Sequence, residues 1–165
     1  MRTKKRQIGL LLEGDRAFFI HALRERLAKR GIQVSKREIS GIASWDYNRI
    51  SRFARSHGIP LQDLLELIDL VYMMFFSSNG VRWRKPLPSL AGATPGQRLR
   101  ELRRLRKIRL NEFARRARLG LENLCRYENG KRSLTSAELR TLIGIACVLD
   151  CPLVDVYREI LGMLV

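Results

Sequence analysis

The side chains that could support catalysis or hold a metal are few and widely spaced in this sequence. The two histidines, His21 and His57, have no acidic or cysteine partner at a catalytic or ligand spacing. The three cysteines form no Cys-x-x-Cys pair and have no nearby histidine, so neither a zinc site nor a disulfide framework is indicated. Paired carboxylates, a nucleophile beside a base and a glycine-rich phosphate loop are not recognisable either. We therefore predict a protein that is not an enzyme and has no metal, cofactor or small-molecule ligand.

Cationic side chains are the abundant chemical groups. The 165 residues include 32 Lys and Arg against 16 Asp and Glu, which gives a formal net charge of +16 at pH 7 and a pI of about 11.0. The excess is spread over both halves of the chain. A polyanionic partner is expected, with nucleic acid favoured over an anionic membrane surface.

No segment has the pattern of a membrane span or a secretory signal. The apolar run at residues 8–12 is short and is followed at once by charged residues. The longest apolar stretch, residues 64–76, contains Glu66 and Asp69 and is shorter than the roughly 20 residues that a bilayer span requires. The expected location is the cytoplasm, with reduced thiols and no membrane partner.

Apolar residues recur at spacings of three and four along most of the chain, which predicts an all-α fold. Residues 77–94 are rich in Ser, Gly and Pro and are interpreted as a linker between two domains, 1–76 and 95–165. The first domain is predicted to be a small four-helix domain. Its helices are expected at about residues 15–30, 35–43, 45–56 and 61–76, the second of them starting with a Ser35 to Glu38 capping box.

The second domain is predicted to contain five helices, at about residues 95–107, 110–118, 121–128 and 137–149 and from Pro152 onward. Only Leu119 and Gly120 separate the second helix from the third. Gly120 can serve as the N-cap of the third helix. The spacing therefore predicts a tight helix-turn-helix.

This domain also carries a recognisable set of residues: Gly96-x-x-Leu99, Phe113-Ala114, Leu119, Leu124, Tyr127-Glu128-Asn129-Gly130-Lys131 and Leu149-x-x-Pro152-Leu153. The set resembles the Cro/phage-repressor (XRE-like) helix-turn-helix family over about residues 96–157. The resemblance implies a five-helix repressor-like fold and a sequence-specific transcriptional regulator of double-stranded DNA. It also implies a bacterial or phage-encoded, nucleoid-associated protein whose helix 121–128 enters the major groove.

The resemblance assigns roles to individual residues. Asn123 is placed to pair with adenine and Arg126 with guanine, although Arg126 could instead bind a phosphate and Glu122 could simply complement the helix dipole. Arg103 and Glu128 take the positions of a structural, partly buried ion pair. The expected base contacts are Leu121, Glu122, Asn123 and Arg126. The expected phosphate contacts are Asn129, Lys131 and Arg132, with Arg115, Arg116 and Arg118 as further candidates that could equally form a solvated helix face.

Two positions differ from the family pattern, both at the start of the second helix of this domain. Leu110 stands where the family typically has Gln, and Arg109 stands at the capping position in place of Ser or Thr. The core positions of the pattern are retained.

The first domain echoes the second. Residues 53–63 match residues 145–155 at a shift of 92 positions, and residues 23–43 echo the first two helices of the second domain. These echoes predict either a degenerate copy of the same fold, shorter by about one helix and without Glu-Asn-Gly-Lys, or an unrelated small bundle.

The helix predicted at residues 61–76 is apolar nearly all round and must be buried. It is expected to pack in a homodimer interface or against the other domain, or to form the central core helix.

Two other functions are compatible with the sequence. One is an antitoxin-like or other protein-interaction module that retains a helix-turn-helix as a docking surface. The other is a non-specific nucleic-acid binder, for which DNA and RNA of unrelated sequence would bind alike.

Overall fold

The structure is a computed structural model that describes the backbone of residues 13–76, 85–163 and 165. Every regular element in these residues is helical, which confirms the predicted all-α class for the described part of the chain. Residues 1–12 of the predicted first domain and 77–84 of the predicted linker lie outside the described residues. Within the described ranges, none of the helices combines the length and the apolar composition that a bilayer span needs.

The elements of the first half follow the predicted order, and the predicted helix at 61–76 has the predicted bounds. They are α1 (Glu13–Lys29), α2 (Lys36–Ile39), the 3-10 turn η2 (Ile42–Ser44), α3 (Tyr47–Ser56) and α4 (Leu61–Phe76).

The second half contains a longer series of elements. They are α5 (Pro95–Leu105), α6 (Leu110–Ala117), α7 (Leu121–Glu128), the 3-10 turn η3 (Leu134–Ser136), α8 (Leu139–Leu149), α9 (Leu153–Asp155) and η4 (Val156–Ile160), which has π-helical hydrogen bonding.

The helix predicted over residues 35–43 is interrupted, which corrects that prediction. Its start is as expected: the N–H of Glu38 donates to Ser35 Oγ at 3.2 Å, and the N–H of Ser35 donates to Glu38 Oε2 at 2.7 Å. Hydrogen bonds from the backbone and side chain of Ser35 to the Glu38 carboxyl lower the pKa of that carboxyl. The helix ends because the Ser40 hydroxyl bonds to a backbone carbonyl of α2 and because Gly41, which follows, is a poor helix former.

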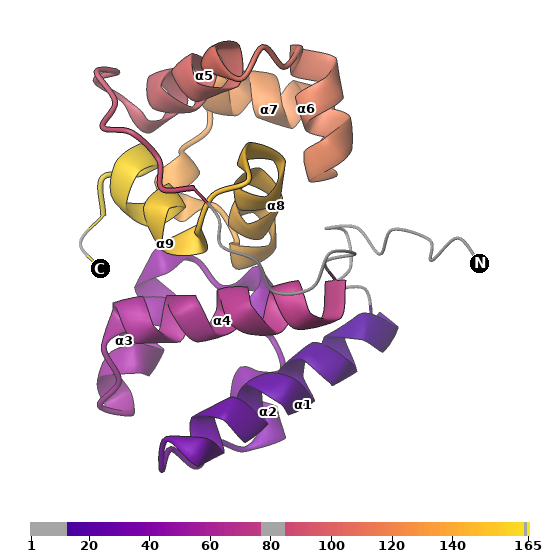
Figure 1. Ribbon diagram of the computed structural model, residues 1–165, viewed down its shortest axis with the longest axis vertical. Helices are drawn as coiled ribbons and strands as arrows, with labels where there is room; N and C mark the ends of the chain where they lie inside the picture. The colour runs from indigo at the N-terminus through magenta and orange to yellow at the C-terminus, as the bar shows by residue number, and fades with distance from the viewer. Residues whose placement is uncertain (1–12, 77–84, 164) are drawn as a thin grey trace.

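Helix α4 lies across the middle of the molecule (Figure 1). Helices α1 and α3 pack against it from one side, and α9 packs against it from the other. Helices α5, α6 and α7 lie at the far end, beyond α8 (Figure 1). The first half of the chain is therefore at the opposite end of the molecule from α7.

A single cluster of buried hydrophobic residues includes side chains from both halves. Backbone groups also bond across the junction: the N–H of Leu139 donates to Trp45 O at 2.9 Å, and the N–H of Leu153 donates to the Asp69 carboxylate at 3.4 Å. Six side chains of α4 are buried in the cluster: Leu64, Leu65, Leu67, Ile68, Val71 and Tyr72. The core of one chain therefore covers most of the apolar surface of α4 that the structure describes.

Several backbone features recur in the two halves at a constant separation of 92 residues. The turns η2 and η3 begin at Ile42 and Leu134, and α3 and α8 begin at Tyr47 and Leu139. After α3 and α8, Gly58 and Asp150 have positive φ angles of 65° and 52°. In each half the next residue donates its N–H to the carbonyl five positions earlier, at 3.0 Å in the first half and 3.1 Å in the second.

The ends of α1 and α5 match as well, at a separation of 76 residues. Gly31 and Lys107 have φ angles of 79° and 54°, and each donates its N–H to the carbonyl three residues earlier at 2.9 Å. From these ends to the 3-10 turns the two halves differ in length. The first half has nine residues, 33–41, which include α2, and the second has 25 residues, 109–133, which include α6 and α7.

Candidate nucleic-acid interface

Helix α7 packs against both α5 and α6. Leu124 and Tyr127 are buried beneath it. The buried Gly96, in the first turn of α5, lies directly against the backbone carbonyl of Tyr127, where a Cβ atom would come closer than 3.0 Å to that oxygen. The C-terminal end of α7 is therefore packed backbone to backbone against α5.

Three residues connect α6 to α7. Arg118 ends α6 in the left-handed conformation with a φ angle of 53°, and Leu119 donates its N–H to Ala114 O at 2.9 Å. Gly120 occupies the N-cap position of α7, as predicted, and no side chain forms a capping hydrogen bond there. This tight connection fixes the direction in which α7 leaves α6.

The N-cap of α6 is Arg109, whose side chain forms no capping hydrogen bond. The first-turn N–H groups of α6 therefore have no side-chain acceptor at that position. Leu110, the first residue of α6, is half-buried and packs against the core.

The outward face of α7 is open to solvent. Leu121 is 50% exposed, and Glu122 and Arg126 are exposed as well, while Asn123 is half-buried. Arg126 Nη2 lies 2.6 Å from Glu122 Oε1, one helical turn away. The structure thus brings the four predicted base-contact residues onto one accessible helix, with Arg126 already paired to Glu122.

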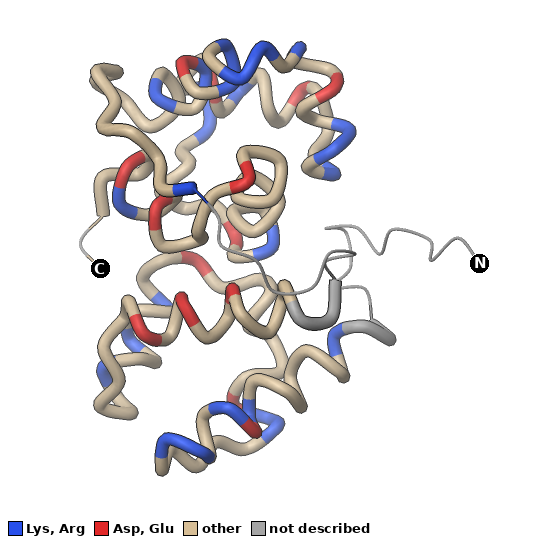
Figure 2. The backbone as a smooth tube through the Cα atoms, viewed as in Figure 1, with Lys and Arg blue, Asp and Glu red and all other residues tan. Residues whose placement is uncertain are grey.

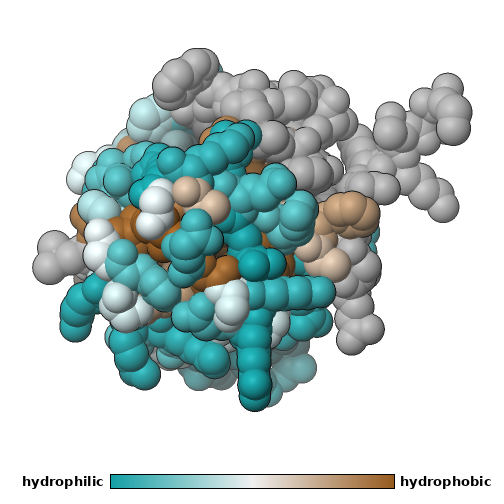
Figure 3. Space-filling model, turned by 90° about the horizontal axis from the view of Figure 1, so that it is seen from below, coloured by the Kyte–Doolittle hydropathy of each residue, from teal (hydrophilic) through white to brown (hydrophobic). Residues whose placement is uncertain are grey.

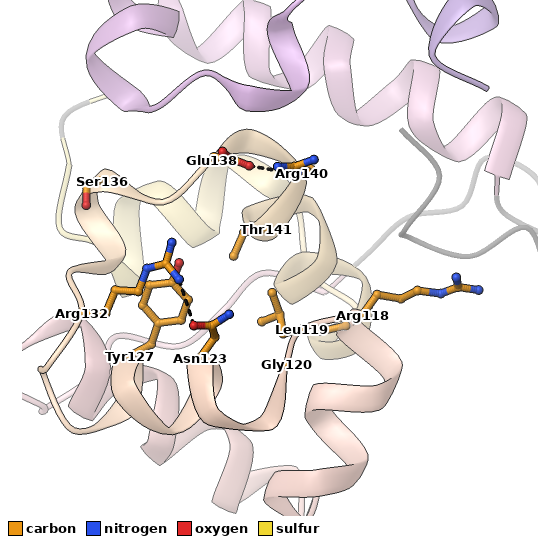
Figure 4. A pocket seen from close by; sticks show the side chains of 11 residues that line it. Arg118, Leu119, Gly120, Asn123, Tyr127, Arg132, Ser136, Glu138, Arg140 and Thr141 are labelled. Atoms are coloured by element: carbon orange, nitrogen blue, oxygen red, sulfur yellow. Dashed lines mark hydrogen bonds and ion pairs between the residues drawn. The ribbon is translucent and has the colours of Figure 1, made fainter. Parts of the chain in front are cut away.

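Asn123 has a protein partner of its own. Arg132 Nη1 donates to Asn123 Oδ1 at 3.0 Å, and the Arg132 guanidinium lies 5.2 Å from the centre of the Tyr127 ring (Figure 4). Burial raises the pKa of the Tyr127 hydroxyl. Arg132, predicted as a phosphate contact, therefore bonds to one of the predicted base-contact residues.

A polar cavity of about 370 Å³ opens beside this cluster, between the α6–α7 connection and the start of α8 (Figure 4). Arg140 pairs with Glu138 on its far wall, and the Arg118 side chain extends away from it (Figure 4). The cavity is lined by Ala117, Arg118, Leu119, Gly120, Asn123, Tyr127, Arg132, Ser136, Glu138, Arg140 and Thr141.

The other predicted phosphate contacts are all exposed, and Figure 2 shows cationic positions gathered at the end formed by α5, α6 and α7. Arg116 lies 3.8 Å from Glu112, a long surface pair. Arg115 and Lys131 form no ion pair with a described acidic side chain. Asn129 accepts a hydrogen bond from Arg100 Nη2 and donates to Cys125 Sγ at 3.3 Å, so both ends of its amide are used within the protein.

Arg103 and Glu128 form a two-pronged pair. Arg103 Nε donates to Glu128 Oε1 at 2.6 Å and Arg103 Nη2 donates to Oε2 at 3.0 Å, and these hydrogen bonds raise the pKa of the guanidinium. Glu128 is only 4% exposed. The remaining Arg103 nitrogen, Nη1, donates to Ile108 O at 3.0 Å, so one side chain links α5, the α5–α6 connection and the end of α7.

Sequence reasoning missed the part played by Arg100. Its Nε lies 3.4 Å from Glu128 Oε2, and its Nη2 reaches Asn129. A signal was available, because Arg100 and Arg103 are three residues apart and therefore share a face of α5.

Within the described ranges, no three His, Cys, Asp or Glu side chains lie close enough together to hold a metal ion. Cys125, Cys147 and Cys151 form no disulfide. The histidines do have acidic neighbours in space, His21 beside Glu25 at 3.3 Å and His57 beside Glu38 at 3.6 Å.

No protein-family model, curated protein sequence or solved structure matches this chain.

Proposed function

We propose that the protein is a sequence-specific, DNA-binding transcriptional regulator. In this proposal α5 to η4 form a repressor-like helix-turn-helix domain and α7 enters the major groove. The supporting observation is that α7 exposes Leu121, Glu122 and Arg126 while cations flank it on the neighbouring elements. A helix so placed has side chains for base edges and charges for the phosphates on either side.

Asn123 is proposed to read adenine, with Arg132 as its positioning residue. An amide oxygen has two lone pairs, so Asn123 Oδ1 can keep its bond from Arg132 and still accept from an adenine amino group. The Tyr127 ring beneath Arg132 restrains the guanidinium.

Arg126 is proposed to read guanine. Its pair with Glu122 uses one terminal nitrogen, and both side chains are mostly exposed, so the pair is weak and can open on binding. Leu121, exposed at the start of α7, is suited to contact a thymine methyl group.

Phosphate contacts are proposed for Lys131, Arg115, Arg116 and Arg118, whose exposed side chains lie around α7. Asn129 and Arg132 have protein partners and are expected to contribute less to phosphate binding. Because phosphate neutralisation releases counterions, the affinity for DNA should fall steeply as salt concentration rises.

The first test is selection of bound duplexes from a random pool, followed by affinity measurements on the selected site. Arg126→Ala is expected to weaken binding to that site by about 1 to 3 kcal/mol, or roughly 5- to 150-fold, and to relax the preference at one base pair. The control, Arg158→Ala, removes the same charge from an exposed position on η4 and should leave the preference unchanged.

Other outcomes identify the alternatives. Equal binding of unrelated duplexes and RNA would make the protein a non-specific nucleic-acid binder. Purification with an obligate protein partner and no enriched DNA site would favour an interaction module. Equal weakening of all duplexes by Arg126→Ala would make Arg126 a phosphate contact.

The homodimer through residues 61–76 stays a prediction. Most of the described apolar side chains of α4 are buried within one chain, so little of that surface is left for a second copy. A palindromic selected site would support a two-fold dimer, and an asymmetric site would support binding by a single chain.

A further inference from the structure

Three arginines lie along α3 at intervals of three residues. Arg49, Arg52 and Arg55 are all exposed, and none forms an ion pair with an acidic side chain in the described part of the chain. Helix α3 itself contains no acidic residue. We call these three residues the arginine stripe.

The acidic groups nearest the stripe in sequence or at the ends of α3 already have partners. The Asp46 carboxylate caps α3 by accepting from the N–H of Arg49 at 3.0 Å. Glu38 bonds to Ser35 and lies 3.6 Å from His57, the C-cap of α3. Neither carboxylate forms an ion pair with a stripe arginine.

The arginine stripe lies at a place where the two halves of the chain differ in sequence and in structure. The 92-residue separation aligns it with three small or uncharged residues of α8: Thr141, Gly144 and Cys147. Helix α8 packs against α6, Gly144 is buried and the other two are half-buried. The first half has nine residues where the second has 25, so it lacks a second helix at this place. The corresponding face of α3 is open and cationic.

The arginine stripe and α7 lie in opposite halves of the molecule. Helix α7 lies near one end of the longest axis and α3 lies in the other half, with α8 and α9 between them (Figure 1). Seen from the end formed by α1, α2 and α3, hydrophilic side chains surround a central apolar area (Figure 3).

We propose that the arginine stripe binds the phosphates of a second DNA duplex, so that one chain bridges two duplexes. This proposal rests on the proposed function in one respect: α7 holds the first duplex. Consecutive stripe residues are about 4.5 Å apart along the helix axis, so the three guanidinium groups can follow a run of phosphates. Arg49 also stacks on Trp45, 4.9 Å from the ring centre, which holds its guanidinium in place.

The experiment measures capture of a second duplex. The full-length chain is bound to an immobilised duplex carrying the selected site, and a labelled duplex of unrelated sequence is added. The test variant is R52Q/R55Q, which keeps Arg49 on Trp45. It is expected to lower capture at least about fivefold and to change affinity for the selected site less than about twofold.

The matched control is K29Q/R30Q, which removes the exposed charges of Lys29, the last residue of α1, and of Arg30, which follows it and lies 3.4 Å from Asp63. It is expected to retain capture, because the loss depends on the stripe and not on net charge. Thermal unfolding of both variants checks that each one is folded.

Three results would overturn the proposal: no capture by the unaltered chain, equal loss of capture in the control, or an equal loss of affinity for the selected site in R52Q/R55Q. The last result would place the stripe on the first duplex. If no selected site is found, the proposed function fails instead. Titration of an unrelated duplex against the unaltered chain and R52Q/R55Q then decides, because equal affinities would remove any role for the stripe.

Discussion

Replacing Glu128 with Ala is expected to lower the free energy of unfolding by about 3 to 5 kcal/mol. The carboxylate is 4% exposed and accepts two hydrogen bonds from Arg103. Its removal leaves the half-buried Arg103 guanidinium without its counterion and frees the end of α7 from α5. Equilibrium urea unfolding followed by circular dichroism measures the loss.

Glu122→Ala is the matched control for this prediction. Glu122 lies on the same helix and is also paired with an arginine, Arg126 at 2.6 Å, but its side chain is 77% exposed. Its removal should cost less than about 1 kcal/mol, because water screens the pair and solvates the remaining charge. Similar losses in the two variants would show that the Arg103 pair does not hold α7 in place.

The elements that could be predicted from the sequence are those with strong local signals. Helix α4 has its predicted bounds because Pro60 precedes it and its apolar residues recur at helical spacings as far as residue 76. Helix α7 has its predicted bounds because Gly120 and the Asn129-Gly130 pair flank it. In both cases the signal lies within a few residues of the element.

Local patterns could not predict the contacts between the halves. The bond from Leu139 to the Trp45 carbonyl and the bond from Leu153 to the Asp69 carboxylate join residues far apart in sequence. Periodicity shows that an apolar face must be buried, but it does not show which partner covers it. Packing of α4 against the other domain was one of the predicted alternatives, but the sequence did not identify α9 as the element that packs there.

At the candidate site, too, some contacts could be predicted from the sequence and others could not. The Glu122 to Arg126 pair follows from a spacing of four residues on a helix. The bond between Arg132 and Asn123 depends on how the loop after α7 folds back, and the sequence has no local signal for it. The prediction of Arg132 as a phosphate contact therefore overlooked its place beside Asn123, a predicted base-contact residue.

Gly96→Ala is the second change expected to have a large effect, a loss of about 3 kcal/mol in the free energy of unfolding. The added Cβ would meet the Tyr127 carbonyl oxygen at less than 3.0 Å, and a backbone atom cannot rotate away as a side chain can. Helix α5 must then move off the end of α7, which also stretches the Arg103 pair to Glu128.

The same substitution at Gly41 is the control, because a Cβ there meets its nearest atom, Trp45 Nε1, at an ordinary 3.5 Å. Thermal unfolding should show a fall in Tm of roughly 6 to 12 °C for Gly96→Ala and little change for Gly41→Ala. Since α7 is the proposed reading helix, Gly96→Ala should also weaken binding to the selected DNA site although Gly96 touches no base. An unchanged Tm together with unchanged DNA affinity would mean that α5 and α7 can separate without consequence, and the close backbone contact would then have no part in positioning α7.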